Sequence, residues 1–263
     1  TLFGSRFAMT VGSRWDHFSV TGQTVWMPRV NIALSPIRNT RVTLGYGQYS
    51  QIPDFFQLYG EFGNPRLRAE RAGHYVAGVE QQINDKTRIR VEAYDREDRS
   101  GIYSVANEIR LVNAGIVGPR VGVNAGKPLE NTLRSYSRGV EIFLQRRSAN
   151  KLLGWISYAY SRTRVTDVAS GLRWDGDFDQ PHTFNLYGSY RWTNSLNVSA
   201  KYRYGTNFPV PGFLRLERNG SISIIEQRNQ LRMEAYSRLD FRVNKAFRFD
   251  HLQLTLYGEV LNV

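Results

Sequence analysis

The segment Leu196-Asn-Val-Ser-Ala-Lys-Tyr-Arg-Tyr204 alternates strictly between apolar and polar side chains. Its even positions hold leucine, valine, alanine and tyrosine, and its odd positions hold asparagine, serine, lysine and arginine. Successive side chains of a β-strand point to opposite faces of a sheet, so this period of two predicts a strand with one apolar and one polar face.

The same alternation recurs along the whole chain. It is found in residues 30–34, 42–46, 89–93, 140–144, 184–192, 239–245 and 252–260. No segment shows a competing helical period, so the sequence predicts an all-β protein. If the apolar face of residues 252–260 contacts a membrane, we expect Leu254 to face lipid near the middle of that membrane. Its neighbour Thr255 would face the lumen.

The connections between these segments alternate in length. Short turns fall near residues 38–39, 84–86, 148–150, 193–195 and 250–251, and longer stretches cover 17–27, 51–66, 104–133, 166–181 and 208–232. Every second connection is long, so all the long ones belong at one end of the sheet. This predicts about eleven antiparallel strands in an up-and-down order, which is typical of outer-membrane barrels.

Aromatic residues mark both ends of the apolar positions. One group lies beside the short turns and the other towards the long connections: Tyr190, Trp192, Phe247 and Phe249, and then Tyr46, Tyr158, Tyr160, Tyr202 and Tyr204. Two such belts are typical of the membrane interfaces of a transmembrane barrel. The alternative is a soluble sandwich with aromatic core residues, but its strands are usually shorter.

Composition narrows the remaining classes of protein. The 263 residues contain no cysteine, which excludes disulfide scaffolds and thiolate metal sites. Apolar runs are far shorter than the roughly 18 residues of a membrane helix. The net charge of +12 raises nucleic acid as a partner. The basic residues are scattered about one per strand rather than clustered, so we expect no nucleic-acid binding.

Several motifs, which follow one another in the same order as in the family, resemble the barrel of TonB-dependent outer-membrane receptors. These motifs are Pro28-Arg-Val-Asn-Ile-Ala-Leu-Ser-Pro36, Thr40–Pro53, Asn64-Pro-Arg-Leu-Arg-Ala-Glu70 followed by Val79-Glu80, Asp177–Phe184 and Leu256-Tyr-Gly-Glu-Val-Leu-Asn262. The segment Ala235–Val243 is similar to members that have a carboxypeptidase-regulatory-like amino-terminal extension. The resemblance covers essentially the whole chain.

The resemblance implies a fold, a location and a function. Residues 1–263 would be the carboxy-proximal half of one 22-stranded barrel, without the signal peptide, the plug domain and the closing strand. The whole protein would lie in the cell outer membrane among its lipids. It would bind a scarce small-molecule, saccharide or peptide ligand and import it, with energy from the TonB complex acting through the plug. Alternatives are a passive porin or structural barrel, and an enzyme with its site at the rim.

The long connections supply the candidate ligand-binding residues. Exposed aromatic and arginine side chains recur at recognition sites, and the candidates are Arg110, Trp174, Phe208, Phe213 and Arg215. Polar positions such as Lys201, Arg203 and Arg242 would continue a basic path below them.

Metal and catalytic motifs are weak. The four histidines are far apart in sequence, so we expect no histidine metal site. No nucleophile–base pair can be recognised, and we expect no catalytic residue and no cofactor. Asp175, Asp177 and Asp179 have the spacing of the start of a calcium loop, whose remaining ligands are missing, and calcium binding stays open. The glycine-rich segment 122–127 is one residue too short for a phosphate-binding loop and is followed by Pro128.

Overall fold

The computed structural model describes residues 6–103, 128–225 and 227–263. Its main sheet contains eleven strands in succession among these residues. They are β1 (Phe7–Phe18), β2 (Gln23–Leu34), β3 (Thr40–Gln51), β4 (Glu70–Asn84), β5 (Thr87–Tyr103), β6 (Glu130–Ala149), β7 (Leu152–Asp167), β9 (His182–Arg191), β10 (Leu196–Gly205), β13 (Tyr236–Arg248) and β14 (Gln253–Val260).

The smaller elements lie in the connections. A short helix, α1 (Phe55–Tyr59), lies between β3 and β4, and β8 (Arg173–Asp175) pairs with β7. The strands β11 (Leu214–Leu216) and β12 (Ile222–Ile224) form a hairpin of their own. The helix α1 has five residues, and the described part of the chain contains no helix with the length and hydropathy of a transmembrane segment.

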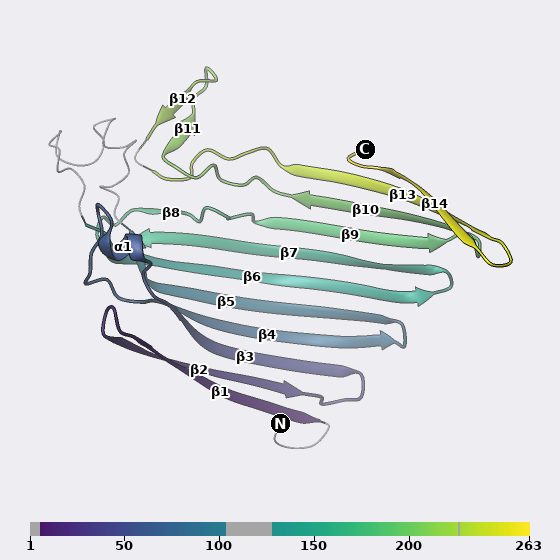
Figure 1. Cartoon of the computed structure of the whole chain (residues 1–263), viewed down its shortest axis with the longest axis horizontal. Coiled ribbons are helices and arrows are strands. Elements are labelled where there is room, and N and C mark those ends of the chain that lie inside the picture. Colours follow the sequence, from purple (N-terminus) through teal and green to yellow (C-terminus); the bar gives the residue numbers. More distant parts are fainter. Residues whose placement is uncertain (1–5, 104–127, 226) are drawn as a thin grey trace.

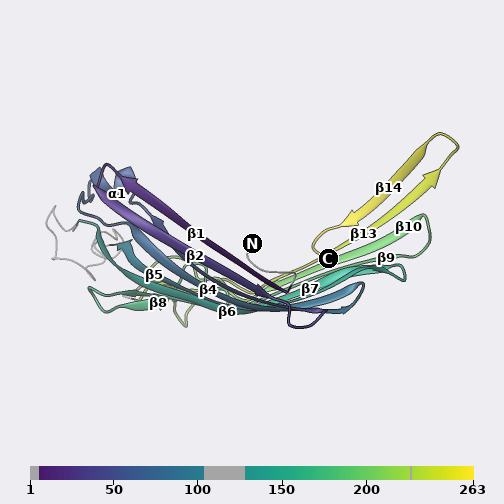
Figure 2. The same cartoon turned by 90° about the horizontal axis from the view of Figure 1, so that it is seen from below.

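Each strand of the main sheet pairs antiparallel with the next one along it, as Figure 1 shows. The sheet is strongly curved and remains open, with β1 at one edge and β14 at the other (Figures 1 and 2). The predicted all-β, up-and-down barrel wall of about eleven strands is therefore confirmed. The curvature follows from the right-handed twist of neighbouring strands, which accumulates across a wide sheet.

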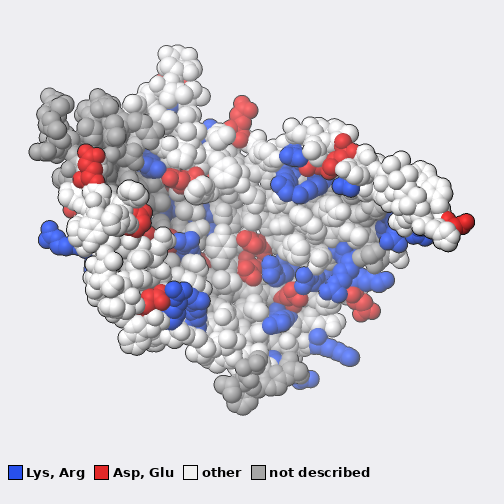
Figure 3. All heavy atoms as spheres, in the orientation of Figure 1, with Lys and Arg blue, Asp and Glu red and all other residues white. Residues whose placement is uncertain are grey.

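The strand register sorts the side chains into two faces. Directly paired residues lie on the same face, so Ile89, Leu144, Ile156 and Leu186 form one apolar row across four strands. We call the face with this row the outward face. The alternate positions form the inward, concave face, and Figure 3 shows lysine, arginine and acidic side chains spread over it. The predicted split into one apolar and one polar face is confirmed.

The two ends of the sheet differ as predicted, with one correction. The short turns lie at one end, and the segments that contain α1, β8, β11 and β12 lie at the other (Figure 1). The stretch 17–27 is not a long loop. Strand β1 continues to Phe18 and strand β2 begins at Gln23, so only residues 19–22 lie between them. Unbroken backbone pairing between β1 and β2 from Phe7↔Leu34 to Phe18↔Gln23 keeps this stretch in the sheet.

The aromatic belts lie on the outward face. Trp192 and Phe249 beside the short turns are 63% and 60% exposed, and Tyr160 and Tyr204 towards the other end are 41% and 37% exposed. The face expected for Leu254 is confirmed, since it pairs with Phe247. The expected depth is wrong. This pair lies next to the turn 249–252, so Leu254 belongs to the aromatic belt and not to the middle of the wall.

The wall is divided near the loop end, between β2 and β3. Their pairing covers only Arg29–Leu34 of β2 and stops at Pro28, which has no backbone N–H to donate. Beyond this point the side chain of Gln23 donates to the carbonyl of Leu67 at 2.8 Å and accepts from the N–H of Ala69 at 3.0 Å. The segment before β4 thus replaces β3 as the neighbour of β2. Val25, Met27 and Ala69 form a small buried cluster there.

Candidate binding surface at the loop end

The candidate ligand residues differ in their exposure. Trp174 and Phe213 are 5% and 2% exposed, so the expectation that they are exposed is wrong. Phe208 is 38% exposed. Arg215 is also exposed and forms an ion pair of 2.8 Å with Glu217. Arg110 lies outside the described residues.

Each buried aromatic has a local structural role. Trp174 lies on β8 opposite Val165 of β7, and its ring centre is 5.7 Å from that of Tyr103. Phe213 lies just before β11, and the guanidinium of Arg228 is 5.8 Å from the centre of its ring. Trp174 therefore packs its connection against the ends of β5 and β7, and Phe213 packs within its own connection. Each burial removes a large apolar area from water.

Arg232 joins two of the long connections, 168–181 and 206–235. One of its terminal nitrogens lies 2.8 Å from the carboxylate of Asp179 and 2.5 Å from that of Asp175. The other donates to the backbone carbonyls of Asp179 at 3.1 Å and Asn207 at 2.9 Å. The Asp179 side chain is 0% exposed, and its second oxygen accepts from the N–H of Thr163. This guanidinium thus compensates a buried charge.

A second set of contacts reinforces the first. Asn229 donates to the carbonyl of Asp175 at 2.7 Å and to the carboxylate of Asp177 at 2.8 Å. Arg228 forms an ion pair of 3.1 Å with Asp177. Burial favours a higher pKa for Asp177, but the hydrogen bonds from Arg228 and Asn229 outweigh it and lower the pKa below its ordinary value.

These contacts bear on the calcium hypothesis. The three carboxylates at 175, 177 and 179 are neutralised by arginine side chains. The described residues contain no group of three or more acidic or histidine side chains arranged to hold a metal ion. In this arrangement Asp175 and Asp179 share the guanidinium of Arg232, Asp177 is bound by Arg228 and Asn229, and the three aspartates connect the loops.

The inward face carries the predicted basic residues on neighbouring strands. Lys201 and Arg203 of β10 lie opposite Asp240 and Arg238 of β13, and Ser199 lies opposite Arg242. Arg238 forms an ion pair of 2.7 Å with Asp240. The predicted basic residues therefore lie on neighbouring strands, and the carboxylate of Asp240 partly neutralises their charge.

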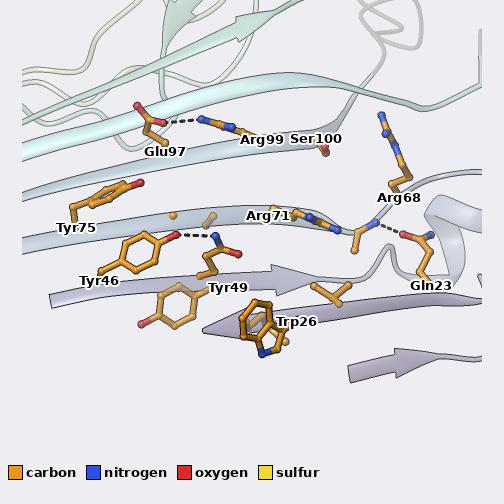
Figure 4. Close-up of a pocket in the computed structure, with 16 residues that line it drawn as sticks. Gln23, Trp26, Tyr46, Tyr49, Arg68, Arg71, Tyr75, Glu97, Arg99 and Ser100 are labelled. Carbon is orange, nitrogen blue, oxygen red and sulfur yellow. Dashed lines mark hydrogen bonds and ion pairs between the residues drawn. The ribbon is translucent and has the colours of Figure 1, made fainter. Parts of the chain in front are cut away.

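A hollow of about 440 Å³ lies where β2 parts from β3 (Figure 4). Its lining combines aromatic and charged side chains from both faces of the sheet: Trp26, Tyr46, Tyr49, Tyr75, Arg68, Arg71, Glu97 and Arg99, with glycine and alanine between them. Gln48 donates to the hydroxyl of Tyr46 at 2.7 Å. Aromatic surfaces beside guanidinium groups suit an anionic ligand that has an apolar part.

Sequence reasoning missed this hollow, although two signals were present. Pro28 interrupts a strand and so predicts lost pairing on one side. The outward positions of β5 change from Ile89, Val91 and Ala93 to Asp95 and then further charged residues. Such a change along one face marks the point where a strand leaves an apolar environment.

The sequence matches the family described as TonB dependent receptor-like, beta-barrel, over residues 1–263. No curated protein matches it. Among solved structures, it is similar to a ferric enterobactin receptor mutant of Pseudomonas aeruginosa in complex with enterobactin. The identity is 17% and the TM-score is 0.73, and the match covers 99% of this chain and 38% of that chain.

Two further structures are similar in fold. The outer membrane transporter YddB of Escherichia coli matches at 12% identity and a TM-score of 0.72, covering 98% of this chain and 39% of that chain. The ferripyoverdine receptor of the outer membrane of P. aeruginosa matches at 14% identity and a TM-score of 0.68. This match covers 98% of this chain and 32% of that chain. The chain spans little more than a third of the length of these proteins. The whole-length match, together with the open up-and-down sheet, establishes that the chain belongs to the TonB-dependent receptor β-barrel family.

Proposed function

We propose that residues 1–263 form the carboxy-proximal part of the barrel wall of an outer-membrane receptor that imports a scarce solute. A plug domain and the remaining strands would come from the rest of the protein. The proposal rests on the curved sheet, which is apolar on its outward face and polar on its concave face, in a chain that matches the barrel family over its whole length. A closed wall of this kind is suited to enclose a polar passage across a bilayer.

Energy for import would come from the TonB complex acting on the plug, and this segment would carry no catalysis. The similar structures are receptors and transporters, two of them described with an enterobactin or a ferripyoverdine ligand. We propose a small molecule as the ligand class, with saccharides and peptides as the competing classes. Lipid of the outer membrane would contact the outward face.

Uptake by whole cells tests this function. We expect that deleting the gene abolishes accumulation of one labelled solute from a panel of ferric siderophores, oligosaccharides and peptides. Deleting tonB should give the same loss even when the receptor is present. A passive porin predicts uptake that does not depend on TonB, and steady ion conductance of the purified protein in a planar bilayer. Either result would overturn the proposal.

We propose that the outer-end candidates contribute to ligand binding in two ways. Phe208 and Arg215 are exposed and would touch the ligand, as would Arg110 in the connection outside the described residues. Trp174 and Phe213 are buried and would hold in place the loops that present these exposed residues.

Paired substitutions test this division. Phe208→Ala combined with Arg215→Ala should weaken binding of the imported solute about tenfold or more, since two recognition contacts are lost. The yield of folded barrel should stay the same. An isotherm equal to that of the unaltered receptor would remove both residues from the site. Arg218→Ala in the same connection is the matched control.

The amino-terminal organisation is a separate proposal. The segment Ala235–Val243 resembles receptors with a carboxypeptidase-regulatory-like extension, and we propose that the whole protein has one. Reading the coding sequence upstream of residue 1 tests this directly. An upstream sequence that passes from signal peptide to plug without such a domain would contradict it.

A further inference from the structure

The outward face changes abruptly from apolar to charged towards the loop end. Across β5, β6 and β7 the row Ala93, Val140 and Tyr160 is followed by the row Asp95, Arg138 and Arg162. The next row contains Glu97, Tyr136 and Arg164, and Arg134 lies beyond it. All these side chains have the same facing as the apolar rows, so the charged residues lie on the outside of the wall and not in its concave interior.

Six of these outward residues form what we call the outer arginine patch: Arg71, Arg99, Arg134, Arg138, Arg162 and Arg164. Arg71 of β4 lies directly opposite Arg99 of β5. Figure 4 shows the change from aromatic to basic side chains along the strands. Tyr46 and Tyr75 lie on one side of the view, and Arg99, Arg71 and Arg68 lie further towards the loop end. Six guanidiniums on four adjacent strands form a surface of one dominant sign.

Carboxylates neutralise only part of the patch. Arg138 contacts Asp95 at 2.9 Å and Glu97 at 3.4 Å, and Glu97 also lies 3.3 Å from Arg99. A third carboxylate, Asp175, lies 2.7 Å from Arg164. Among the described residues, Arg71, Arg134 and Arg162 have no acidic partner. The patch therefore keeps a positive surplus of three charges.

Two hollows give the patch a shape that a ligand can enter. The first is the aromatic-lined hollow beside β2, which includes Arg71 and Arg99. The second, of about 340 Å³, is lined by residues that include Arg99, Arg134, Arg138 and Arg164. Arg99 and Glu97 belong to both linings, so the two hollows adjoin.

We propose that the outer arginine patch binds the phosphate groups of an outer-leaflet lipid headgroup. The patch continues the apolar band that would contact acyl chains, so an amphiphile can place its chains on that band and its head on the arginines. A guanidinium can donate two parallel hydrogen bonds to two oxygens of one phosphate. This favours the phosphate monoesters of an anionic head over a zwitterionic head, in which an ammonium group offsets the charge of the phosphodiester. The proposal rests on membrane insertion of the barrel, but it does not depend on solute import.

Native mass spectrometry of the detergent-purified full-length receptor tests the proposal. The probes are bisphosphorylated lipid A, its dephosphorylated form and phosphatidylcholine. We expect retention of the bisphosphorylated lipid alone. In the variant Arg134→Gln with Arg162→Gln, the apparent affinity should fall about tenfold, because each arginine near an anionic headgroup contributes a substantial part of binding.

The matched control is Arg41→Gln with Arg90→Gln. Both arginines are exposed and lie on the inward face, and the change in net charge is the same. Equal loss in the control would show a general charge effect and overturn the proposal. Equal retention of the dephosphorylated lipid would do the same. So would displacement of the lipid by millimolar inorganic phosphate, which would assign the patch to free phosphate.

Folding of each variant is checked by heat-modifiable migration in gels. If the glutamine pair fails to fold, the variant Arg134→Lys with Arg162→Lys keeps both charges and removes the forked donors. It should retain the lipid more weakly than the unaltered receptor, and unchanged retention would contradict binding by the guanidiniums. Solute uptake measured on the same variants should stay intact, which separates this proposal from the import function.

Discussion

Arg232 shows how one loop residue can determine the arrangement of two connections. It contacts Asp175 and Asp179, which lie 57 and 53 residues earlier in the chain, and Asp179 is fully buried. A buried carboxylate without a partner is strongly unfavourable, so the two connections open or close together. The exposed aromatic Phe208 is positioned by the same contacts, because Arg232 also binds the carbonyl of Asn207.

Removing this guanidinium should loosen the loops and leave the wall intact. For Arg232→Ala we expect the free energy of local opening to fall by about 3 kcal/mol, as for other broken buried pairs. Limited proteolysis of the folded receptor should then cleave 206–235 many times faster. Arg215→Ala removes an exposed arginine from the same connection and should leave the cleavage rate near that of the unaltered protein. Equal rates for the two variants would contradict the assigned role.

The contacts of Asp177 make the same region sensitive to acid. Its pKa in the folded protein is lowered, so its stabilising contribution is complete above the unfolded value of about 4 and is lost as the pH falls through the folded value. Pepsin cleavage between residues 206 and 235 should accelerate below about pH 4, after correction with an unfolded peptide of the same sequence. In Asp177→Asn the corrected rate should be high and nearly independent of pH. A pH response that persists in this variant would assign it to another group.

At the scale of elements, strand facing decides what a substitution costs. Leu186 of β9 faces outward in the row with Ile156, and its neighbour Asn185 faces inward opposite Ser157 and Arg203. Leu186 also lies between the two aromatic belts, so it would sit within the hydrocarbon region. The two residues form a matched pair on one strand.

For Leu186→Arg we expect a loss of about 2–4 kcal/mol in the folding free energy of the full barrel in lipid. For Asn185→Arg the loss should be much smaller, because that side chain faces the polar interior. Urea-driven unfolding in phospholipid vesicles measures both values. A larger loss for Asn185→Arg would reverse the assignment of the faces.

Strand elements were predictable and loop packing was not, for a physical reason. Alternation is a local property, so the segment 196–204 reveals both its conformation and its two faces. The burial of Trp174 and Phe213 depends on contacts with Tyr103 and Arg228, which sequence proximity does not reveal. The depth of Leu254 failed similarly, because alternation assigns a face but not a height.

At the scale of the whole molecule, the outward face determines the behaviour in solution. Many large apolar side chains there are exposed, for example Trp15, Trp26 and Leu256 at 72%, 60% and 54%. A continuous apolar surface of this kind is rare on soluble monomers, and in the proposed barrel wall it is the surface that would contact lipid.

The full-length receptor should therefore stay in the membrane fraction and require detergent for extraction. Its circular dichroism should be of the β type, since the described residues are mostly strand. A monodisperse species recovered without detergent would contradict membrane insertion. Size-exclusion chromatography with light scattering, in the presence and in the absence of detergent, gives this comparison.

The arginines on β6 also define a hydrophobic thickness. Arg138 and Arg146 face outward eight positions apart, with only Val140, Ile142 and Leu144 between them on that face. At about 3.3 Å per residue this span is roughly 26 Å along the strand, and a tilt of about 40° reduces it to roughly 20 Å. A bilayer with a hydrocarbon core of about 30 Å would pull both guanidiniums below its interfaces. Hydrophobic mismatch would thus disfavour thick membranes and sort the barrel into a thin one.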